Sequence, residues 1–155
     1  MKKILISVLG KGRQNDYELT EYKIENFPAK KSKLVSDILQ DFIQPDKTYI
    51  VGTNESLWHV ADEYIKNYEK VIIPFGKNSD EFWQMFKIFS GLPVENSEIH
   101  FDITHGFRSI PLFVSTILNF FKNQKNAKIT GVYYGIFEAK ENGITPVVNM
   151  LPFRH

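Results

Sequence analysis

The 155-residue sequence contains no cysteine. Disulfide bonds, zinc–thiolate sites and cysteine nucleophiles are therefore excluded, and the composition suits a reducing cytoplasm. The formal net charge is only +1, so no general basic field would attract long nucleic acid. No apolar run approaches the length that crosses a membrane, and the run that begins at Lys3 is too short for a signal peptide. We expect a cytoplasmic protein with neither a membrane nor a long nucleic acid as its partner.

Two common nucleotide-binding patterns are also missing. The segment Gly10-Lys11-Gly12-Arg13 lacks the Gly-Lys-Ser/Thr ending of a P-loop and the third glycine of the dinucleotide fingerprint. His59, His100 and His155 show no metal-like spacing, and no paired His/Asp cluster indicates a divalent metal site. We therefore expect neither a cofactor nor a metal.

Short apolar runs alternate with segments of helical spacing along the chain, which predicts one α/β domain over residues 1–155. The sheet should be mostly parallel, with helices on both faces. Ser32 and Ser56 are expected to cap two of the helices, and Glu141-Asn142-Gly143 predicts an antiparallel β-hairpin at the C-terminal edge. The expected strands are 3–9, 17–24, 48–51, 71–73, 99–103, 128–137 and 144–150, and the expected helices 33–43, 57–65, 79–89 and 111–122.

The segment Asp102-Ile103-Thr104-His105-Gly106-Phe107-Arg108 is the densest candidate site in the sequence. It joins a predicted strand to a predicted helix, and ligands of open α/β sheets bind at such strand ends. The N-terminus of the following helix favours an anion at the same place. Thr104 and Arg108 can reach a phosphate group, the arginine through two parallel N–H bonds.

The other residues of this segment suit supporting roles. Asp102 can accept hydrogen bonds from backbone amides and order the turn. Gly106 allows a positive φ or the close approach of a ligand. His105 titrates near neutrality, so it is a candidate proton donor or base if a substrate lies beside it.

Two more turns should leave the same edge of the sheet, and all three also have structural explanations. Gly10–Arg13 offers backbone amides and two cations, but it could be a solvated loop. Gly52–Ser56 could present hydroxyl groups to a ribose or phosphate, or Ser56 could serve only as a helix cap. Asp102–Arg108 could be a capped helix start with an exposed arginine, although the density of polar groups favours a ligand site.

The pattern Asp/Asn-x-Ser/Thr-x-x-x-Arg/Lys after the fourth core strand resembles the CRISPR-associated Rossmann-fold (CARF) sensor domains. The run from Asp102 to Pro111 is similar to one branch of that family. Residues 3–10, the tyrosine-containing stretch to Tyr22 and residues 51–58 also fit this branch. The resemblance covers nearly the whole chain and implies a Rossmann-like fold.

CARF domains bind cyclic oligoadenylates, the ring-shaped second messengers of type III CRISPR complexes. The resemblance therefore implies a cyclic tetra- or hexa-adenylate ligand held across a two-fold homodimer. The positions that match the family's ligand-binding residues are Gly10, Lys11, Gly12, Thr53, Asn54, Ser56, Thr104, His105, Gly106 and Arg108. We add Asp102 to this set because it is expected to order the third turn.

Most relatives carry a second, effector domain, often a ribonuclease with an Arg-x4–6-His pair, and this sequence contains no such pair. We expect residues 1–155 to form a single CARF-like domain without an effector domain. Stand-alone members are often ring nucleases, so metal-independent cleavage of the ring is expected, leaving a 2′,3′-cyclic phosphate. Arg108 and Lys11 would stabilise charge on the phosphate, Thr53 would orient the ribose, and His105 would protonate the leaving oxygen.

Three alternatives stay open at this point. The chain could bind the ring without hydrolysing it, as a sensor whose effector is absent or separate. It could instead be a Rossmann-like protein for an ordinary mononucleotide, although the missing glycine fingerprint argues against that function. It could also be a structural interaction module.

Overall fold

The computed structural model of the chain describes residues 1–106 and 110–151. Within these residues one eight-stranded sheet has the strand order β3-β2-β8-β7-β6-β1-β4-β5. The elements, in chain order, are β1 (Lys2–Leu9), β2 (Thr20–Ile24), β3 (Lys30–Ser32), α1 (Val35–Ile43), β4 (Lys47–Gly52), α2 (Trp58–Tyr64), β5 (Glu69–Ile72), α3 (Ser79–Ser90), β6 (Ser97–His105), α4 (Ile110–Gln124), β7 (Lys128–Gly135), the short 3-10 helix η1 (Phe137–Ala139) and β8 (Ile144–Asn149).

The sheet has a parallel centre and a mixed flank. Strands β5, β4, β1, β6 and β7 are neighbours in that order, and each pair is parallel. Strand β8 returns antiparallel to β7, so the expected α/β fold with a mostly parallel sheet and C-terminal antiparallel strands is confirmed. The expected edge position of β8 is wrong, because β2 pairs in parallel with its other side and β3 pairs antiparallel with β2.

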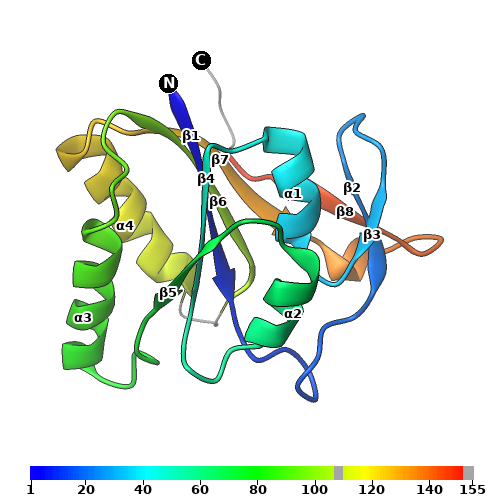
Figure 1. Cartoon of the computed structure of the whole chain (residues 1–155), viewed down its shortest axis with the longest axis horizontal. Coiled ribbons are helices and arrows are strands. Elements are labelled where there is room, and N and C mark those ends of the chain that lie inside the picture. Colours follow the sequence, from blue (N-terminus) through cyan, green and yellow to red (C-terminus); the bar gives the residue numbers. More distant parts are fainter. Residues whose placement is uncertain (107–109, 152–155) are drawn as a thin grey trace.

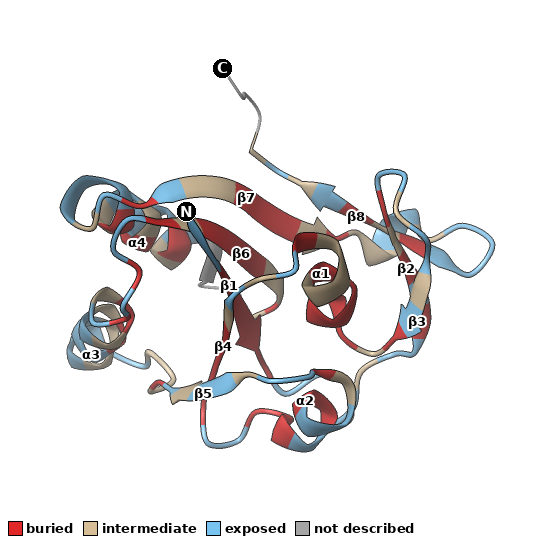
Figure 2. Cartoon of the chain, turned by 45° about the horizontal axis from the view of Figure 1, so that its top comes forward, coloured by how far each residue is buried: buried red, intermediate tan, exposed pale blue. Residues whose placement is uncertain are grey.

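Helices cover both faces of the sheet, with α3 and α4 on one face and α1 and α2 on the other (Figure 1). The alternation of side chains along β1 explains why both faces are apolar. Ile4, Ile6 and Val8 belong to the core beneath α3 and α4, whereas Leu5 and Leu9 belong to the two clusters beneath α1 and α2. All five side chains are buried, and the interior position of β1 is visible in Figure 2.

Neither of the serine caps expected from the sequence forms. The first residue before α1 is Leu34, and its side chain caps nothing. The hydroxyl of Ser32 instead accepts a hydrogen bond from the N–H of Leu34, at 3.2 Å. Leu57 precedes α2 in the same way, and Ser56 donates to the carbonyl of Leu9 at 2.7 Å. Helices α1 and α2 thus begin without a side-chain cap from the residue that precedes them. The first N–H of α1 is instead bonded by a residue distant in the sequence.

Helix α4 packs apolar side chains onto the core of the domain. Val114, Ile117 and Phe121 are buried and form part of the core beneath this helix. Leu112, in its first turn, is 83% exposed. In the described part of the chain, no helix is both long enough and apolar enough to span a bilayer.

Candidate functional site

A cleft of about 370 Å³ lies at the carboxyl ends of β1 and β6. This is the edge at which open α/β sheets bind ligands. Six of the residues that the sequence predicts as ligand-binding line it, together with three that it does not predict. The nine lining residues are Gly10, Lys11, Gly12, Arg13, Tyr17, Thr104, His105, Gly106 and Phe137.

Two larger hollows lie elsewhere on the described residues and have the character of ordinary surface. One, of about 540 Å³, lies at the amino end of β4, where Lys47 and Glu69 already form an ion pair. The other, of about 740 Å³, lies along the C-terminal half of α4. It is lined mainly by asparagine, lysine and aliphatic side chains, and no acidic residue lines it. We place the functional site in the smaller cleft because it lies at the ligand-binding edge of the sheet and is lined by six of the predicted residues.

The glycines of the first loop are required by the packing of the backbone. A Cβ atom on Gly10 would lie 2.7 Å from the carbonyl oxygen of His105, so this glycine lets β1 and β6 approach closely. Gly12 has φ +68°, and a Cβ atom there would lie 2.2 Å from the carbonyl oxygen of Asp16. Only glycine can hold the loop in this shape, and the shape brings the flanking cations Lys11 and Arg13 to the cleft.

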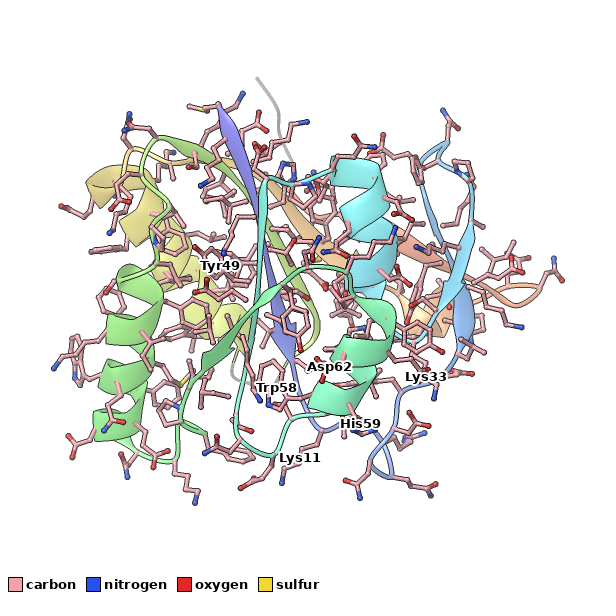
Figure 3. All side chains as sticks on the ribbon, in the orientation of Figure 1. Lys11, Lys33, Tyr49, Trp58, His59 and Asp62 are labelled. Carbon is pink, nitrogen blue, oxygen red and sulfur yellow. The ribbon has the colours of Figure 1, made fainter. Side chains whose placement is uncertain are left out.

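Lys11 lies at the rim of the cleft, on the side of the molecule where β1 ends (Figure 3). Its ammonium group is 3.3 Å from a carboxylate oxygen of Glu55 and 5.0 Å from the centre of the Phe75 ring. The side chains of Lys11 and Glu55 are 49% and 61% exposed, so this ion pair is screened and weak. An anionic ligand can therefore compete with Glu55 for the lysine.

Asp102 is fully buried beneath the cleft and joins three strands. One of its carboxylate oxygens accepts a hydrogen bond from the hydroxyl of Ser7 on β1, at 2.7 Å. The other accepts from the backbone N–H and the hydroxyl of Thr104, at 3.0 and 2.6 Å. The hydroxyl of Thr104 in turn accepts from the N–H of Gly135 on β7, at 3.0 Å. Burial raises the pKa of Asp102, while these donors act to lower it.

This network defines the roles of two residues of the third turn. Asp102 is 0% exposed and makes no direct ligand contact, so its place among the ligand-binding residues is corrected to the supporting role, ordering the turn, that the sequence also predicts for it. Thr104 lines the cleft, but its hydroxyl already donates to Asp102 and accepts from Gly135. Its remaining contribution to the cleft is its position in the wall.

His105 lines the cleft, although only 7% of the residue is exposed. Its Nε2 accepts the N–H of Val35, the first residue of α1, at 3.1 Å. Burial lowers the pKa of His105 to about 3, so the imidazole is neutral and carries its proton on Nδ1. The expected role of His105 as the proton donor to a leaving oxygen does not fit this arrangement.

The second turn packs against the first loop but does not line the cleft. Thr53 and Ser56 are buried, and the hydroxyl of Ser56 accepts the N–H of Thr53 at 2.9 Å. The N–H of Leu57 also donates to the carbonyl oxygen of Gly10. Asn54 is exposed at the tip of this turn. Thr53, Asn54 and Ser56, which the sequence predicts as ligand-binding, therefore do not line the cleft, and this turn supports the first loop from behind.

The sequence reasoning missed Tyr17 and Phe137. The Tyr17 hydroxyl accepts the N–H of Gly10 at 2.9 Å and donates to the carbonyl oxygen of His105 at 3.5 Å, so it holds both sides of the cleft. Burial raises its pKa to about 12. Phe137 is half-buried in η1, directly after β7 ends. The sequence placed Phe137 inside the expected strand 128–137, whereas β7 ends at Gly135. Because β7 is the parallel neighbour of β6, the residues that follow it lie at the same ligand-binding edge.

Arg108, the phosphate-binding residue expected from the sequence, lies outside the described residues, as does Phe107. Of the residues that the structure does describe at the cleft, Lys11 and Arg13 are the cations. No group of three histidine, aspartate or glutamate side chains arranged to hold a metal ion occurs among residues 1–106 and 110–151. The charge pattern of the cleft therefore suits an anion.

The chain is similar to known proteins over nearly its whole length. The family described as CRISPR system endoribonuclease Csx1, CARF domain, matches residues 4–138. The CRISPR-associated protein MJ1674 of Methanocaldococcus jannaschii is 32% identical over 216 aligned positions, which cover 98% of this chain and 34% of that protein. The chain thus spans about a third of the length of this relative. The matched range includes the whole first loop, Tyr17, the third turn and Phe137.

Proposed function

The chain belongs to the CARF domain family of the CRISPR system endoribonuclease Csx1, and we propose that it binds a cyclic oligoadenylate in the cleft between β1 and β6. The observation that carries this proposal is the composition of the cleft wall. Lys11 and Arg13 supply positive charge, Gly10 and Gly12 supply a backbone that a phosphate can approach, and Phe137 supplies an aromatic ring. Phosphate and adenine each have a chemically suitable neighbour in this wall.

The size of the cleft supports the presence of a second protomer. Small-molecule sites commonly measure about 300–1,000 Å³, and this cleft, at about 370 Å³, is at the low end of that range. It suits one nucleotide unit, not a closed ring of four or six. We propose that two copies of the chain, related by a two-fold axis, offer two such clefts to one symmetric ring.

We further propose that the bound ring is opened slowly without a metal. A ribose 2′-oxygen attacks the adjacent phosphorus, the P–O5′ bond breaks, and the 5′-oxygen takes up the proton that the 2′-hydroxyl loses. The products then end in a 2′,3′-cyclic phosphate and a 5′-hydroxyl. His105 is occupied by Val35, and the Tyr17 hydroxyl donates to a backbone carbonyl. Catalysis therefore rests on positioning of the ring and on stabilisation of charge by Lys11 and, as the sequence predicts, by Arg108.

Calorimetric titration with cyclic tetra-adenylate, cyclic hexa-adenylate, linear tetra-adenylate and AMP tests the proposed ligand. We expect one ring to bind per two chains and AMP to bind far more weakly. Prolonged incubation of each ring in EDTA, followed by chromatography, tests cleavage. Tight binding with an intact ring would identify a sensor without ring nuclease activity. Binding of AMP together with no binding of either ring would refute the proposed function.

Phe137→Ala should weaken binding of the preferred ring by about 1–3 kcal/mol, the usual contribution of one stacked base. The ring of Phe137 lines the cleft and lies 6.2 Å from that of His105, so it is placed to stack on an adenine. Phe27→Ala is the matched control, because Phe27 is also half-buried and packs edge-on against Phe42 outside the cleft. Equal losses of affinity in the two variants would contradict a stacking role for Phe137.

A further inference from the structure

The N-terminal turn of α1 depends on a residue that lies 70 positions away in the sequence. The residue before the helix, Leu34, is extended and makes no side-chain cap. The first N–H of the helix, that of Val35, is nevertheless satisfied, because His105 Nε2 accepts it at 3.1 Å in a buried position. The cap of α1 is therefore supplied by the last residue of β6, at the cleft.

The backbone of the same histidine is tied to the first loop. Its carbonyl oxygen accepts from the Tyr17 hydroxyl at 3.5 Å, and that hydroxyl accepts the N–H of Gly10 at 2.9 Å. The rings of Tyr17 and His105 are also in contact, with their centres 4.6 Å apart. A continuous path of hydrogen bonds and ring contact thus leads from the glycine loop through Tyr17 and His105 to Val35.

We propose that His105 is a positioning residue that couples the first loop of the cleft to the N-terminal turn of α1. A displacement of the loop moves Tyr17, Tyr17 shifts the backbone and ring of His105, and the ring then strengthens or weakens the cap on Val35. Where the coupling is extended to a bound cyclic oligoadenylate it rests on the proposed function, whereas the link between loop and helix does not.

The chemistry of the ring fits this role better than a role in proton transfer. A neutral imidazole with its proton on Nδ1 leaves Nε2 as an acceptor, which is what an unsatisfied helix N–H requires. Burial also keeps the ring neutral by lowering the pKa of His105 to about 3. The cap is consequently present over the whole neutral range of pH.

Amide hydrogen exchange of Val35 measures the cap directly, without any ligand. His105→Leu removes the acceptor and should speed exchange of this amide by roughly fivefold or more, the effect of losing one helix-end hydrogen bond. His105→Gln should restore most of the protection, because its amide oxygen can occupy the position of Nε2. The amide of Gln44 is the control, since it donates to Gln40 at the other end of α1 and should not change.

A double-mutant cycle tests the coupling, again without a ligand. Tyr17→Phe removes the hydroxyl that joins Gly10 to His105, and it should speed exchange at Val35 in the otherwise unchanged protein. The same substitution should have little further effect when His105→Leu is already present. Additive effects of the two substitutions would overturn the proposal, and so would wild-type-like exchange at Val35 in the Tyr17→Phe protein. If His105→Leu fails to fold, Tyr17→Phe combined with His105→Gln decides, because an intact path then predicts the same response as in the parent.

Titration with cyclic tetra-adenylate and cyclic hexa-adenylate adds the functional arm. A ring that binds should increase the protection of Val35 in the parent and in His105→Gln. Binding with no change at Val35 would overturn the extension of the coupling to the ligand. The absence of binding by either ring would count against the proposed function alone, since the mutant cycle judges the link between loop and helix independently.

Discussion

Replacing Asp102 with alanine should lower the free energy of unfolding by about 3–5 kcal/mol. The carboxylate is fully buried and accepts three hydrogen bonds, one from Ser7 and two from Thr104. Alanine would leave these donors without acceptors in the interior, and each such group costs about 1–3 kcal/mol. Since single domains are stable by only about 5–15 kcal/mol, urea denaturation should show a large fall in the midpoint.

Asp102→Asn is the matched control, and it should retain most of the stability. The amide oxygen can accept both bonds from Thr104, and the amide nitrogen can donate to the hydroxyl of Ser7. This geometry also explains why the family pattern admits aspartate or asparagine at its first position. A loss in Asp102→Asn as large as that in Asp102→Ala would contradict the network, because it would mean that the negative charge and not the hydrogen bonding holds the strands.

The parent protein and the Asp102→Asn variant should differ in how their free energies of unfolding depend on pH. Burial raises the pKa of Asp102 above its ordinary value of 3.8, so the folded state keeps this proton at a pH where the unfolded chain has lost it. The stability that this group contributes is complete below the unfolded pKa and is lost as the pH rises through the folded pKa. The free energy of unfolding of the parent minus that of Asp102→Asn should therefore fall as the pH rises from about 4 toward neutrality. A difference that grows with pH would show that the donors outweigh burial.

The parallel core of the sheet, with helices on both of its faces, could be predicted because the local pattern indicates it. The uninterrupted apolar run of β1 is typical of a strand covered on both faces, and each following helix must pack on one of those faces. The pairing of β2 with β8 has no such local signal. It joins Glu21 to Ile144, two residues more than a hundred positions apart, and the sequence between them would fit a C-terminal hairpin at the sheet edge equally well.

The parts of the candidate site that depend on backbone position could be predicted from the sequence. The parts that depend on which hydrogen-bond partner a side chain has could not. Gly10 and Gly12 could be placed at the cleft because turns after β1 must lie at the ligand-binding edge. Ser56 could bind a phosphate, cap a helix or satisfy a neighbouring turn, and only the structure shows that it donates to Leu9. His105 was open to the same ambiguity, because its acceptor role depends on Val35, which the fold and not the sequence brings beside it.

Gly12→Ala should weaken binding of the preferred cyclic oligoadenylate by roughly 2–4 kcal/mol, the sum of backbone strain and overpacking. Gly12 has φ +68°, and its added Cβ would lie 2.2 Å from the carbonyl oxygen of Asp16 and 2.9 Å from a methyl carbon of Leu57. The adjoining turn is tight, because Arg13 and Asp16 exchange both backbone hydrogen bonds, at 2.9 and 3.1 Å. It cannot give way without moving as a unit.

The displacement should reach the opposite wall of the cleft. Asp16 accepts the N–H of Tyr17 at 2.8 Å, and the Tyr17 hydroxyl holds Gly10 and faces His105. A shift of the turn therefore disturbs Lys11, Arg13 and Tyr17 together. Leu57 belongs to the core beneath α2, so we expect the thermal midpoint to fall as well, and the affinity is compared at a temperature at which both proteins are folded.

Gly143→Ala separates strain from collision. Gly143 has a similar positive φ, +78°, but an added Cβ would meet nothing within 4 Å, and the residue lies in the turn before β8. This control should lose a little stability and no affinity, whereas Gly12→Ala should lose affinity in calorimetric titration. If Gly12→Ala bound the ring as tightly as the parent, the first loop would not hold the ligand. The binding site would then have to lie away from the carboxyl end of β1.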